Sequence, residues 1–405
     1  MPFRTALSGL NASSAELRVI GNNVANASTT GFKESRAEFA DIFATSNLGV
    51  TANAIGTGVR VSSVSQQFTQ GNVEFTDNNL DLAINGQGFF QLNDNGVNAY
   101  SRAGRFGVDR NGFVVNSQQQ QLNIFQADLN GNITGAMGPL QLDRSDIAPS
   151  ASGQIDLSAN LDASLSPPAT AVFDPADASS YNNSTSLTVY DSLGTPHLAT
   201  MYFVKTATPN QWESRLYMDG NAQGGANTIE FDSSGAIDTT TFPSTVTIGG
   251  INPGTGAATM SLDLDFSNTT QYGSSFNVSN ITQDGFATGR LSGIDISDAG
   301  LITSRFTNGQ SRTLGQIAVA TFNNSQGLRQ LGDTSWAETF DSGAPLVAAP
   351  GAGAAGLIES GALEGSNVDL TEQLVGMITA QRNFQANAQV ITTADTITQT
   401  IINIR

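Results

Sequence analysis

The sequence predicts an α+β protein of several domains, with paired amphipathic helices at the two chain ends and two mainly antiparallel β domains between them. Apolar residues recur at helical spacing near both termini, whereas the middle alternates apolar and polar residues around turns such as Asn95-Gly96. The net charge of −18 lies in this middle region, because residues 1–32 carry +1 and residues 366–405 carry −1. Neutral ends on an acidic body are expected when the termini pack together and the body faces water.

The amino-terminal helix is predicted from alternating steps of three and four, a short heptad pattern. Thr29-Thr30-Gly31 supplies its stop signal. Taken alone, the stripe fits an ordinary core helix equally well, and the matching stripe at the other chain end favours a coiled pair. The stripe consists of Phe3, Ala6, Leu10, Ser13, Leu17, Ile20, Val24 and Ala27.

The carboxyl-terminal helix is predicted to begin at Asp369, which has the capping-box partner Glu372 three residues later. A two-faced helix of about 50 Å is not self-sufficient and needs partners to pack on. Its apolar stripe consists of Leu370, Leu374, Met377, Phe384, Ala388 and Ile391, and drifts onward through Ala394, Ile397, Ile401 and Ile404. A second, uncharged polar row within about 80° of helix surface consists of Gln381, Gln385, Gln389, Thr392, Thr396, Gln399 and Asn403.

Composition excludes several classes of function. The chain has no cysteine, which excludes disulfides and thiolate chemistry and suits a chain that is threaded unfolded to an oxidising exterior. The start lacks the apolar core of a secretory signal, and no apolar run reaches 18 residues, so we expect a soluble protein exported, if at all, by another route. With Lys33 and Lys205 as its only lysines, the chain lacks the basic patch that nucleic acid or an anionic membrane requires.

No catalytic, metal or cofactor site is predicted. The single histidine, His197, is expected in a solvated turn, and no G-x-S-x-G motif accompanies it. Residues 128–132 resemble half of a calcium loop without its distal Glu, Asp263 and Asp265 alternate along a strand, and Gly249-Gly250 lacks the Lys-Ser/Thr of a phosphate loop. We therefore expect a protein that is not an enzyme.

Long motifs at both ends resemble a known family. ALSGLNASSAELRVIGNNVANASTTGFK (6–33) and GALEGSNVDLTEQLVGMITAQRNFQANAQVITTADTI (361–397) resemble the terminal motifs of bacterial flagellar axial proteins, which include rod, hook and hook-associated subunits. DLAINGQGFFQL (81–92) and YSRAGRFGVDRNGFVVN (100–116) resemble the β-rich domain shared by distal rod and hook proteins. Residues 314–343 are similar to the returning half of that domain.

The middle of the chain distinguishes branches of this family. Residues 146–284 form an insert that distal rod proteins lack, and LTVYDSLGTPHLATMYFVK (187–205) is similar to the outer domain of hook proteins. The resemblance implies nested domains shared by amino- and carboxyl-terminal segments. These are a helical inner-tube domain (1–33 with 364–405), an extended connector (34–70), a β-rich middle domain (71–145 with 285–363) and a β-rich outer domain (146–284). Within the connector, residues 59–68 have a strand-like pattern.

The resemblance also implies a function and partners. A subunit of this kind is exported by the flagellar type III apparatus without a cleaved signal peptide, and it polymerises outside the cell beneath a cap. The homopolymer is a curved tube that transmits torque as a flexible universal joint, with distal rod, hook cap and hook–filament junction proteins as its other partners. We expect the terminal helices to be largely disordered in the monomer, since their stripes need neighbouring copies for cover.

The polar row of the last helix is interpreted as the wall of the tube's central channel, where neutral side chains stay wet without holding a passing chain. Hydrogen bonding of the row to neighbouring helices is the alternative. Three other functions compete with the hook assignment. They are a distal rod subunit with an unusual insert, a secreted β-rich adhesin or solenoid, which the absence of a short repeat in 71–343 disfavours, and an extracellular hydrolase.

Overall fold

A computed structural model describes residues 2–42, 56–128, 130–143, 145–240, 242–254 and 256–403. The chain forms two compact units. The terminal unit contains both chain ends and comprises Met1–Asp143, Gly293–Ser304 and Arg312–Arg405. The insert unit comprises Arg144–Ser292 and Arg305–Ser311.

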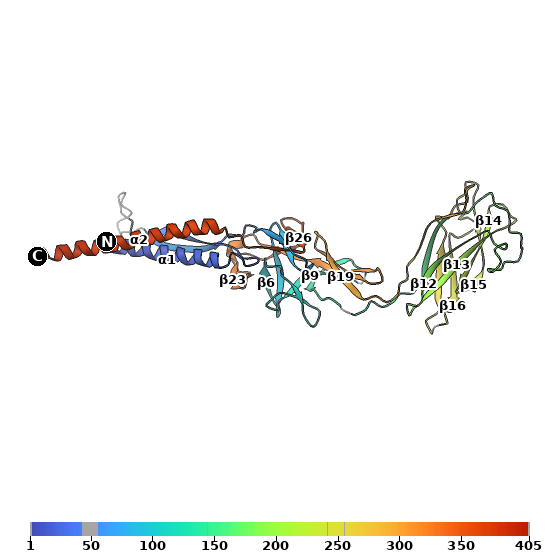
Figure 1. Cartoon of the computed structure of the whole chain (residues 1–405), viewed down its shortest axis with the longest axis horizontal. Coiled ribbons are helices and arrows are strands. Elements are labelled where there is room, and N and C mark those ends of the chain that lie inside the picture. Colours follow the sequence, from blue (N-terminus) through green and yellow to red (C-terminus); the bar gives the residue numbers. More distant parts are fainter. Residues whose placement is uncertain are drawn as a thin grey trace. The chain divides into compact units, whose positions relative to one another are not determined.

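Two long helices of the terminal unit are antiparallel neighbours, α1 (Pro2–Ala25) and α2 (Leu370–Asn403) (Figure 1). Asp369 caps α2 as predicted, because its Oδ1 accepts hydrogen bonds from the backbone N–H groups of Thr371 (2.7 Å) and Glu372 (3.2 Å). After α1 the chain turns at Gly31, whose φ of +70° and close approach to the backbone of Ala103 leave no room for a Cβ.

A β-hairpin lies along α1 within the segment that was predicted to be an extended connector. It pairs β1 (Ser35–Asp41) with β2 (Val59–Gln66), and Ser8 Oγ of α1 accepts a hydrogen bond from the Val59 N–H (3.1 Å). Strand β2 coincides with the strand-like pattern at 59–68, whereas β1 carries no such pattern. Its conformation comes from pairing with β2, a non-local contact.

The rest of the terminal unit is mainly antiparallel β structure. Its largest sheet has thirteen strands with the central order β19-β20-β21-β9-β5-β6-β24-β23, and two-stranded ladders join β26 to β4 and β27 to β3. The predicted Asn95-Gly96 turn is confirmed, since both residues have positive φ between β5 and β6. The strands and one 3-10 helix are β3 (Val73–Phe75), β4 (Leu82–Asn85), β5 (Phe89–Asp94), β6 (Val97–Ser101), β7 (Gly107–Val108), β8 (Val114–Val115), β9 (Gln121–Ala127), β10 (Ile133–Pro139), β19 (Leu291–Ile296), β20 (Leu301–Phe306), β21 (Ser311–Ile317), β22 (Val319–Thr321), η1 (Ser325–Gly327), β23 (Arg329–Gly332), β24 (Ser335–Ala337), β25 (Leu346–Ala348), β26 (Leu357–Ser360) and β27 (Ala362–Glu364).

The insert unit consists of two four-stranded sheets, β16-β17-β11-β18 and β12-β13-β14-β15 (Figure 1). Alternate residues of β13 and β14 point inward, so that Phe203 and Trp212 are fully buried in one core with residues of the other sheet such as Phe266. The strands are β11 (Gln154–Asn160), β12 (Asn183–Tyr190), β13 (Pro196–Lys205), β14 (Gln211–Met218), β15 (Asn221–Glu230), β16 (Thr245–Ile251), β17 (Met260–Asp265) and β18 (Asn277–Gln283).

His197 is buried, so the predicted solvated turn histidine is wrong. Only 5% of the residue is exposed, because two turns of the sheet close over it at the start of β13. Its Nδ1 lies 2.7 Å from an Asp219 carboxylate oxygen in the β14–β15 turn, and its Nε2 lies 3.3 Å from Asp191 in the β12–β13 turn. The sequence places Asp191 only six residues away, but Asp219 arrives through strand pairing, which the sequence pattern did not reveal.

The two carboxylates favour the charged imidazolium. Burial by itself would lower the pKa of His197, but the hydrogen bonds and negative charges of Asp219 and Asp191 together outweigh it and raise that pKa above its ordinary 6.5. In return, the hydrogen bond from His197 lowers the pKa of Asp219. Only the imidazolium donates from both ring nitrogens, so neutral histidine leaves one carboxylate contact without a proton.

We predict that the insert unit loses stability as pH rises. A folded-state pKa above the unfolded value gives stability that is complete below pH 6.5 and is lost as pH rises through the raised pKa. The expected loss is about 1 kcal/mol in the free energy of unfolding, because the Asp219 side chain is half exposed and water screens its charge. Urea unfolding of a Trp336→Phe variant, in which Trp212 is the remaining tryptophan, measures it by fluorescence between pH 6 and 9.5.

The matched reference for this experiment is His197→Gln in the same background. Glutamine does not titrate, so its unfolding free energy should stay flat over the same pH range. A flat profile for the chain that retains His197 would contradict the proposed imidazolium bridge.

Candidate assembly site at the paired chain ends

The contact between α1 and α2 is built on small and polar side chains. Ala380, fully buried, and Gln373 are the buried residues of α2, and both face α1. Gly9 lets α2 approach closely, since a Cβ there would lie 2.6 Å from Asn387 Oδ1. The buried residues of α1, on the sides that face α2 and the β1–β2 hairpin, are Ala6, Ala12, Ser13, Ile20 and Asn23. Small side chains allow the two backbones to approach, and large apolar side chains flank the contact.

The predicted packing residues divide into two groups. Ile20 is buried, and Leu10, Leu17, Val24, Met377, Phe384, Ala388 and Ile391 are partly buried. Phe3, Leu370 and Leu374 remain 40%, 49% and 52% exposed, so in the single chain they contribute little to the helix contact. Whether they are covered by neighbouring copies stays a prediction.

A buried amide network fixes the register of the two helices. Asn23 Nδ2 donates to Gln373 Oε1 (3.0 Å) and to the Ser35 carbonyl (2.8 Å), and Asn23 Oδ1 accepts from the Ser35 N–H (3.0 Å). Gln373 Nε2 then donates to Glu34 Oε1 (2.9 Å). Asn23 is 1% exposed, so any slip of α2 along α1 would leave the buried Asn23 N–H that now bonds to Gln373 without its acceptor.

Beside this network, a buried carboxylate joins segments from distant parts of the chain. Glu364 Oε1, on β27, accepts hydrogen bonds from Lys33 Nζ (2.6 Å) and the Gly71 N–H (3.0 Å). Lys33 Nζ also donates to the Thr69 carbonyl (2.6 Å), and Arg102 Nη1 lies 3.4 Å from the other Glu364 oxygen. The side chains of Lys33 and Glu364 are fully buried, and that of Arg102 is 3% exposed.

The electrostatics of this cluster depend on the single negative charge. Burial lowers the pKa of Lys33, and Glu364 opposes that shift by charge and by its hydrogen bond. Burial likewise lowers the pKa of Arg102, which donates to the carbonyl oxygens of Ile84 (3.2 Å) and Gly86 (2.6 Å). Two buried cations therefore share Glu364. Removing its charge should lower the free energy of unfolding more than removing either cation.

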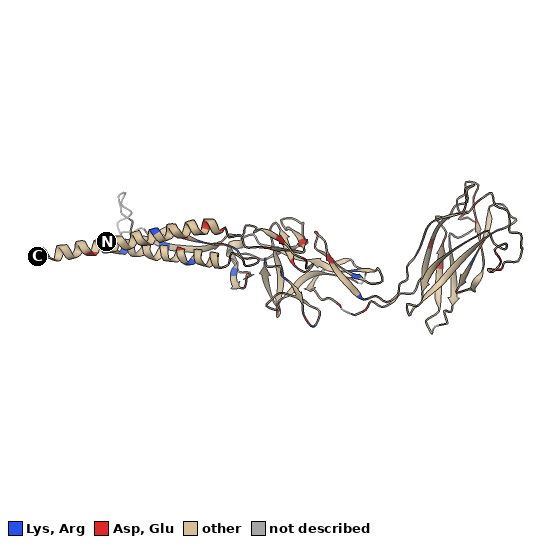
Figure 2. Ribbon diagram, in the orientation of Figure 1, with Lys and Arg blue, Asp and Glu red and all other residues tan. Residues whose placement is uncertain are grey.

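The seven residues of the polar row are all exposed in the single chain, as are two sets of apolar residues on α2. The first set, near the start of the helix, is Leu374, Val375 and Ile378, and the second is Val390, Ile397, Ile401 and Ile402. Ile404 lies outside the described residues. The register that places Gly9 by Asn387 puts Pro2 opposite Ala394, so the end of α2 extends beyond α1 (Figure 1). Figure 2 shows few charged residues along either helix.

Two further findings concern membrane spans and metal sites among the described residues. None of their helices is long and apolar enough to span a membrane. Among the same residues, no group of three or more His, Asp or Glu side chains is arranged to hold a metal ion.

Comparison with known proteins agrees with this arrangement. Matches along the chain are "Flagella basal body rod protein" (3–33), "Flagellar hook protein FlgE/F/G D1 domain" (83–158), "Flagellar basal body protein FlaE D2 domain" (160–286) and "Flagellar basal body rod FlgEFG protein C-terminal" (359–404). The Escherichia coli (strain K12) protein named flagellar hook protein FlgE is 39% identical over 419 residues, with 100% of each chain covered. The chain belongs to the flagellar hook protein family.

More distant hook proteins extend the comparison. That of Borreliella burgdorferi is 32% identical over 437 residues, covering 99% of this chain and 98% of its own. The crystal structure of Helicobacter pylori flagellar hook protein FlgE2 covers 72% of this chain and 100% of its own, with a TM-score of 0.54 and 14% identity, and so shows a shared fold.

Sequence reasoning missed the polar half of this hook-family site. The helical spacing of large apolar side chains does not indicate Asn23, Gln373, Glu364 or Arg102, because their contacts are with residues distant in sequence. Lys33 was noted only for the rarity of lysine. A usable signal was present, since Glu364 is a charged residue between Leu363 and Gly365, and Lys33 follows Phe32, at the inner ends of the two terminal motifs.

Proposed function

We infer that this chain is the structural subunit of a bacterial flagellar hook, a curved tubular homopolymer that works as a flexible universal joint between rod and filament. The observation that carries this inference is full-length similarity to hook proteins, combined with a terminal helix pair whose outer faces are apolar and uncovered. The relatives are named flagellar hook proteins, and a structural rather than an enzymatic role is part of this proposal. A distal rod subunit is the weaker alternative, because the chain matches the D2 domain description over its insert.

In this proposal the paired helices, residues 1–33 with 364–405, form the inner tube. Leu374, Ile378 and the second apolar set of α2 are covered by helices of neighbouring copies. Burial of one large apolar side chain contributes roughly 1.5–3 kcal/mol. The seven exposed side chains of the two sets are buried only in the polymer, where this free energy outweighs the entropy lost in ordering the helices. Residues 34–70 connect the tube to the β-rich middle domain, 71–145 with 285–363, and residues 146–284 form the outer domain.

The same physical reasoning supports the remaining partners. Helices that are ordered only by neighbours suit export as an unfolded chain through a type III apparatus, without a cleaved signal peptide, to the outside of the cell. The uncovered faces of the first and last copies would then meet the distal rod, the hook cap and the hook–filament junction proteins. No contact with nucleic acid, membrane or cofactor is needed.

We predict that purified chain assembles into curved tubes and that a variant lacking residues 1–30 does not, as seen by electron microscopy. Amide exchange of residues 2–25 and 370–403 should be fast in free monomer and slow in tubes, because neighbouring copies complete the cover of both helices. Straight tubes would favour the rod alternative. Strong protection of both helices in the monomer would contradict folding on assembly.

A second part of the proposal concerns the exposed polar row, which we place on the wall of the central channel. The row is uncharged, and its hydroxyls are partly satisfied within the helix, since Thr392 Oγ1 donates to the Gln389 carbonyl (2.9 Å) and Thr396 Oγ1 to the Thr392 carbonyl (2.9 Å). Such a wall presents neither charge nor apolar surface to an unfolded chain in transit.

We predict that Gln385→Leu with Gln389→Leu slows export of later subunits while hook tubes still assemble, because an apolar wall retains passing chains. The measurement is the rate of secretion of filament subunits, with tube length as the control for assembly. Thr379→Leu with Asn383→Leu, exposed on another flank of α2, is the matched control and should leave export unchanged. Normal export in the Gln385/Gln389 variant would argue that the row bonds to neighbouring helices instead.

A further inference from the structure

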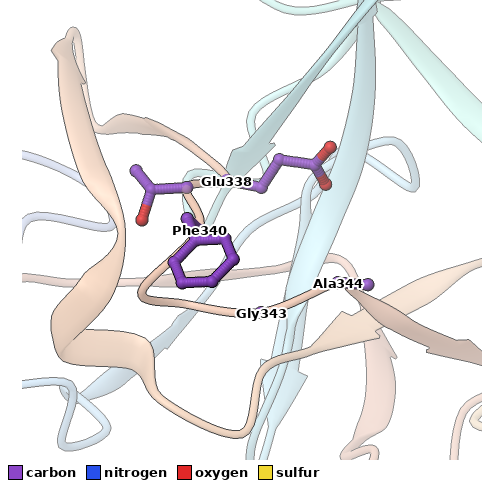
Figure 3. Close-up of a pocket in the computed structure, with 5 residues that line it drawn as sticks. Glu338, Phe340, Gly343 and Ala344 are labelled. Carbon is purple, nitrogen blue, oxygen red and sulfur yellow. The ribbon is translucent and has the colours of Figure 1, made fainter.

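A fully exposed phenylalanine stands on a rigid loop of the terminal unit. Phe340 is 100% exposed, and Figure 3 shows its ring apart from the Glu338 side chain. Tyr100 Oη donates to that Glu338 carboxylate (2.9 Å), which ties the loop to the sheet. A single exposed aromatic ring is common on protein surfaces, but this one projects from an anchored loop, where a partner surface can reach its whole face.

Hydrogen bonds hold the loop in one conformation. The Thr339 N–H donates to Ser342 Oγ (2.9 Å), and Ser342 Oγ donates to the Thr339 carbonyl (2.9 Å). Thr339 Oγ1 donates to the Gly327 carbonyl (2.5 Å), and Asn324 Nδ2 donates to the Asp341 carbonyl (3.0 Å). Ser342 is only 1% exposed, so the loop is anchored beneath a protruding ring. A ring presented in this way loses little conformational entropy on binding.

The same unit contains an aromatic hollow of matching size. Its volume is about 160 Å³. An apolar cavity of about 150 Å³ accepts benzene, so this hollow has the volume for one phenyl ring, with aromatic side chains on part of its wall and polar side chains on the rest. It is lined by Phe68, Gln87, Gly88, Phe89, Arg102, Thr321, Phe322 and Ser325.

The walls of the hollow are as rigid as the loop. Phe68 packs edge-on against Phe89 with centroids 5.5 Å apart, and Phe89 against Phe322 at 5.9 Å. The Arg102 guanidinium lies 5.9 Å from the Phe89 ring centroid, and Trp336 closes the cluster behind Phe68 and Phe89. Phe68 and Phe322 are only partly buried, so ring edges and faces remain open to an entering aromatic side chain.

We propose that Phe340 of one copy inserts into the aromatic hollow of a neighbouring copy, and that this contact joins successive subunits outside the helical tube. The proposal rests on the proposed function, because it requires a homopolymer. The ring cannot fill the hollow of its own chain while it is fully exposed. Two different, complementary surfaces on one chain give a head-to-tail contact, which produces an open helical series of copies when the rotation between copies does not close into a ring.

Cysteine pairs test the contact directly, because the natural chain has no cysteine. Tubes of a Phe340→Cys, Gln87→Cys double variant are oxidised and analysed by denaturing electrophoresis. The expected result is a ladder of covalent multimers, since each copy would link to the next. The matched control, Val97→Cys with Gln87→Cys, places the cysteine at a position that is also exposed (68%) but lies in the β5–β6 hairpin, and it should give no ladder.

A second variant measures the contribution of the ring. Phe340→Ala should raise the critical concentration for tube assembly about tenfold. Phe340→Tyr, which keeps the ring, should have a critical concentration close to that of the natural chain, and so should Val97→Ala. Unfolding of the Phe340→Ala monomer should be unchanged, because the ring makes no buried contact in the single chain.

The outcomes separate this contact from the proposed function. Normal tubes with no ladder from the cysteine pair, or an unchanged critical concentration for Phe340→Ala, would overturn the contact and leave the hook assignment intact. Failure of the unmodified chain to form tubes would overturn the hook assignment, and the contact with it.

Discussion

The terminal unit depends on one buried carboxylate, that of Glu364. It lies where the segment after α1, the segment before α2 and the β structure meet, and among the described residues it is the negative charge that pairs with the buried Lys33 and Arg102. A buried ion cluster of this kind contributes little net stability. Displacing any one member, however, strongly destabilises the fold, because it leaves an unpaired buried charge. Glu364 thus fixes where both chain ends leave the β structure.

The helix pair extends this constraint without completing it. Asn23 and Gln373 set the register, and the small residues Gly9 and Ala380 let the helices approach. Few large apolar side chains are therefore buried between the two helices. Other large apolar side chains remain on the outer faces of α2, where neighbouring copies supply the cover. An element that is correctly positioned but incompletely buried suits a subunit that has to remain unassembled until it reaches the growing end of a polymer.

Local rules predicted much of the fold, and non-local contacts account for what they missed. The cap at Asp369 and the Asn95-Gly96 hairpin follow from short-range chemistry, and both are present. Strand β1, the burial of His197 and the choice of Ala380 as the centre of the α2 contact each depend on a partner distant in sequence. The helical stripes indicated which residues are apolar, but not which of them face the partner in the same chain.

The most direct test of this account is the effect of Glu364→Gln on the terminal unit. In a Trp212→Phe background, Trp336 reports unfolding of this unit in urea, and Glu74→Gln, exposed on the paired strand β3, is the control. We predict a loss of about 3–5 kcal/mol for Glu364→Gln, because two buried cations lose their counter-charge, and a change within about 0.5 kcal/mol for the control. Equal, small effects of the two substitutions would contradict the central role of Glu364.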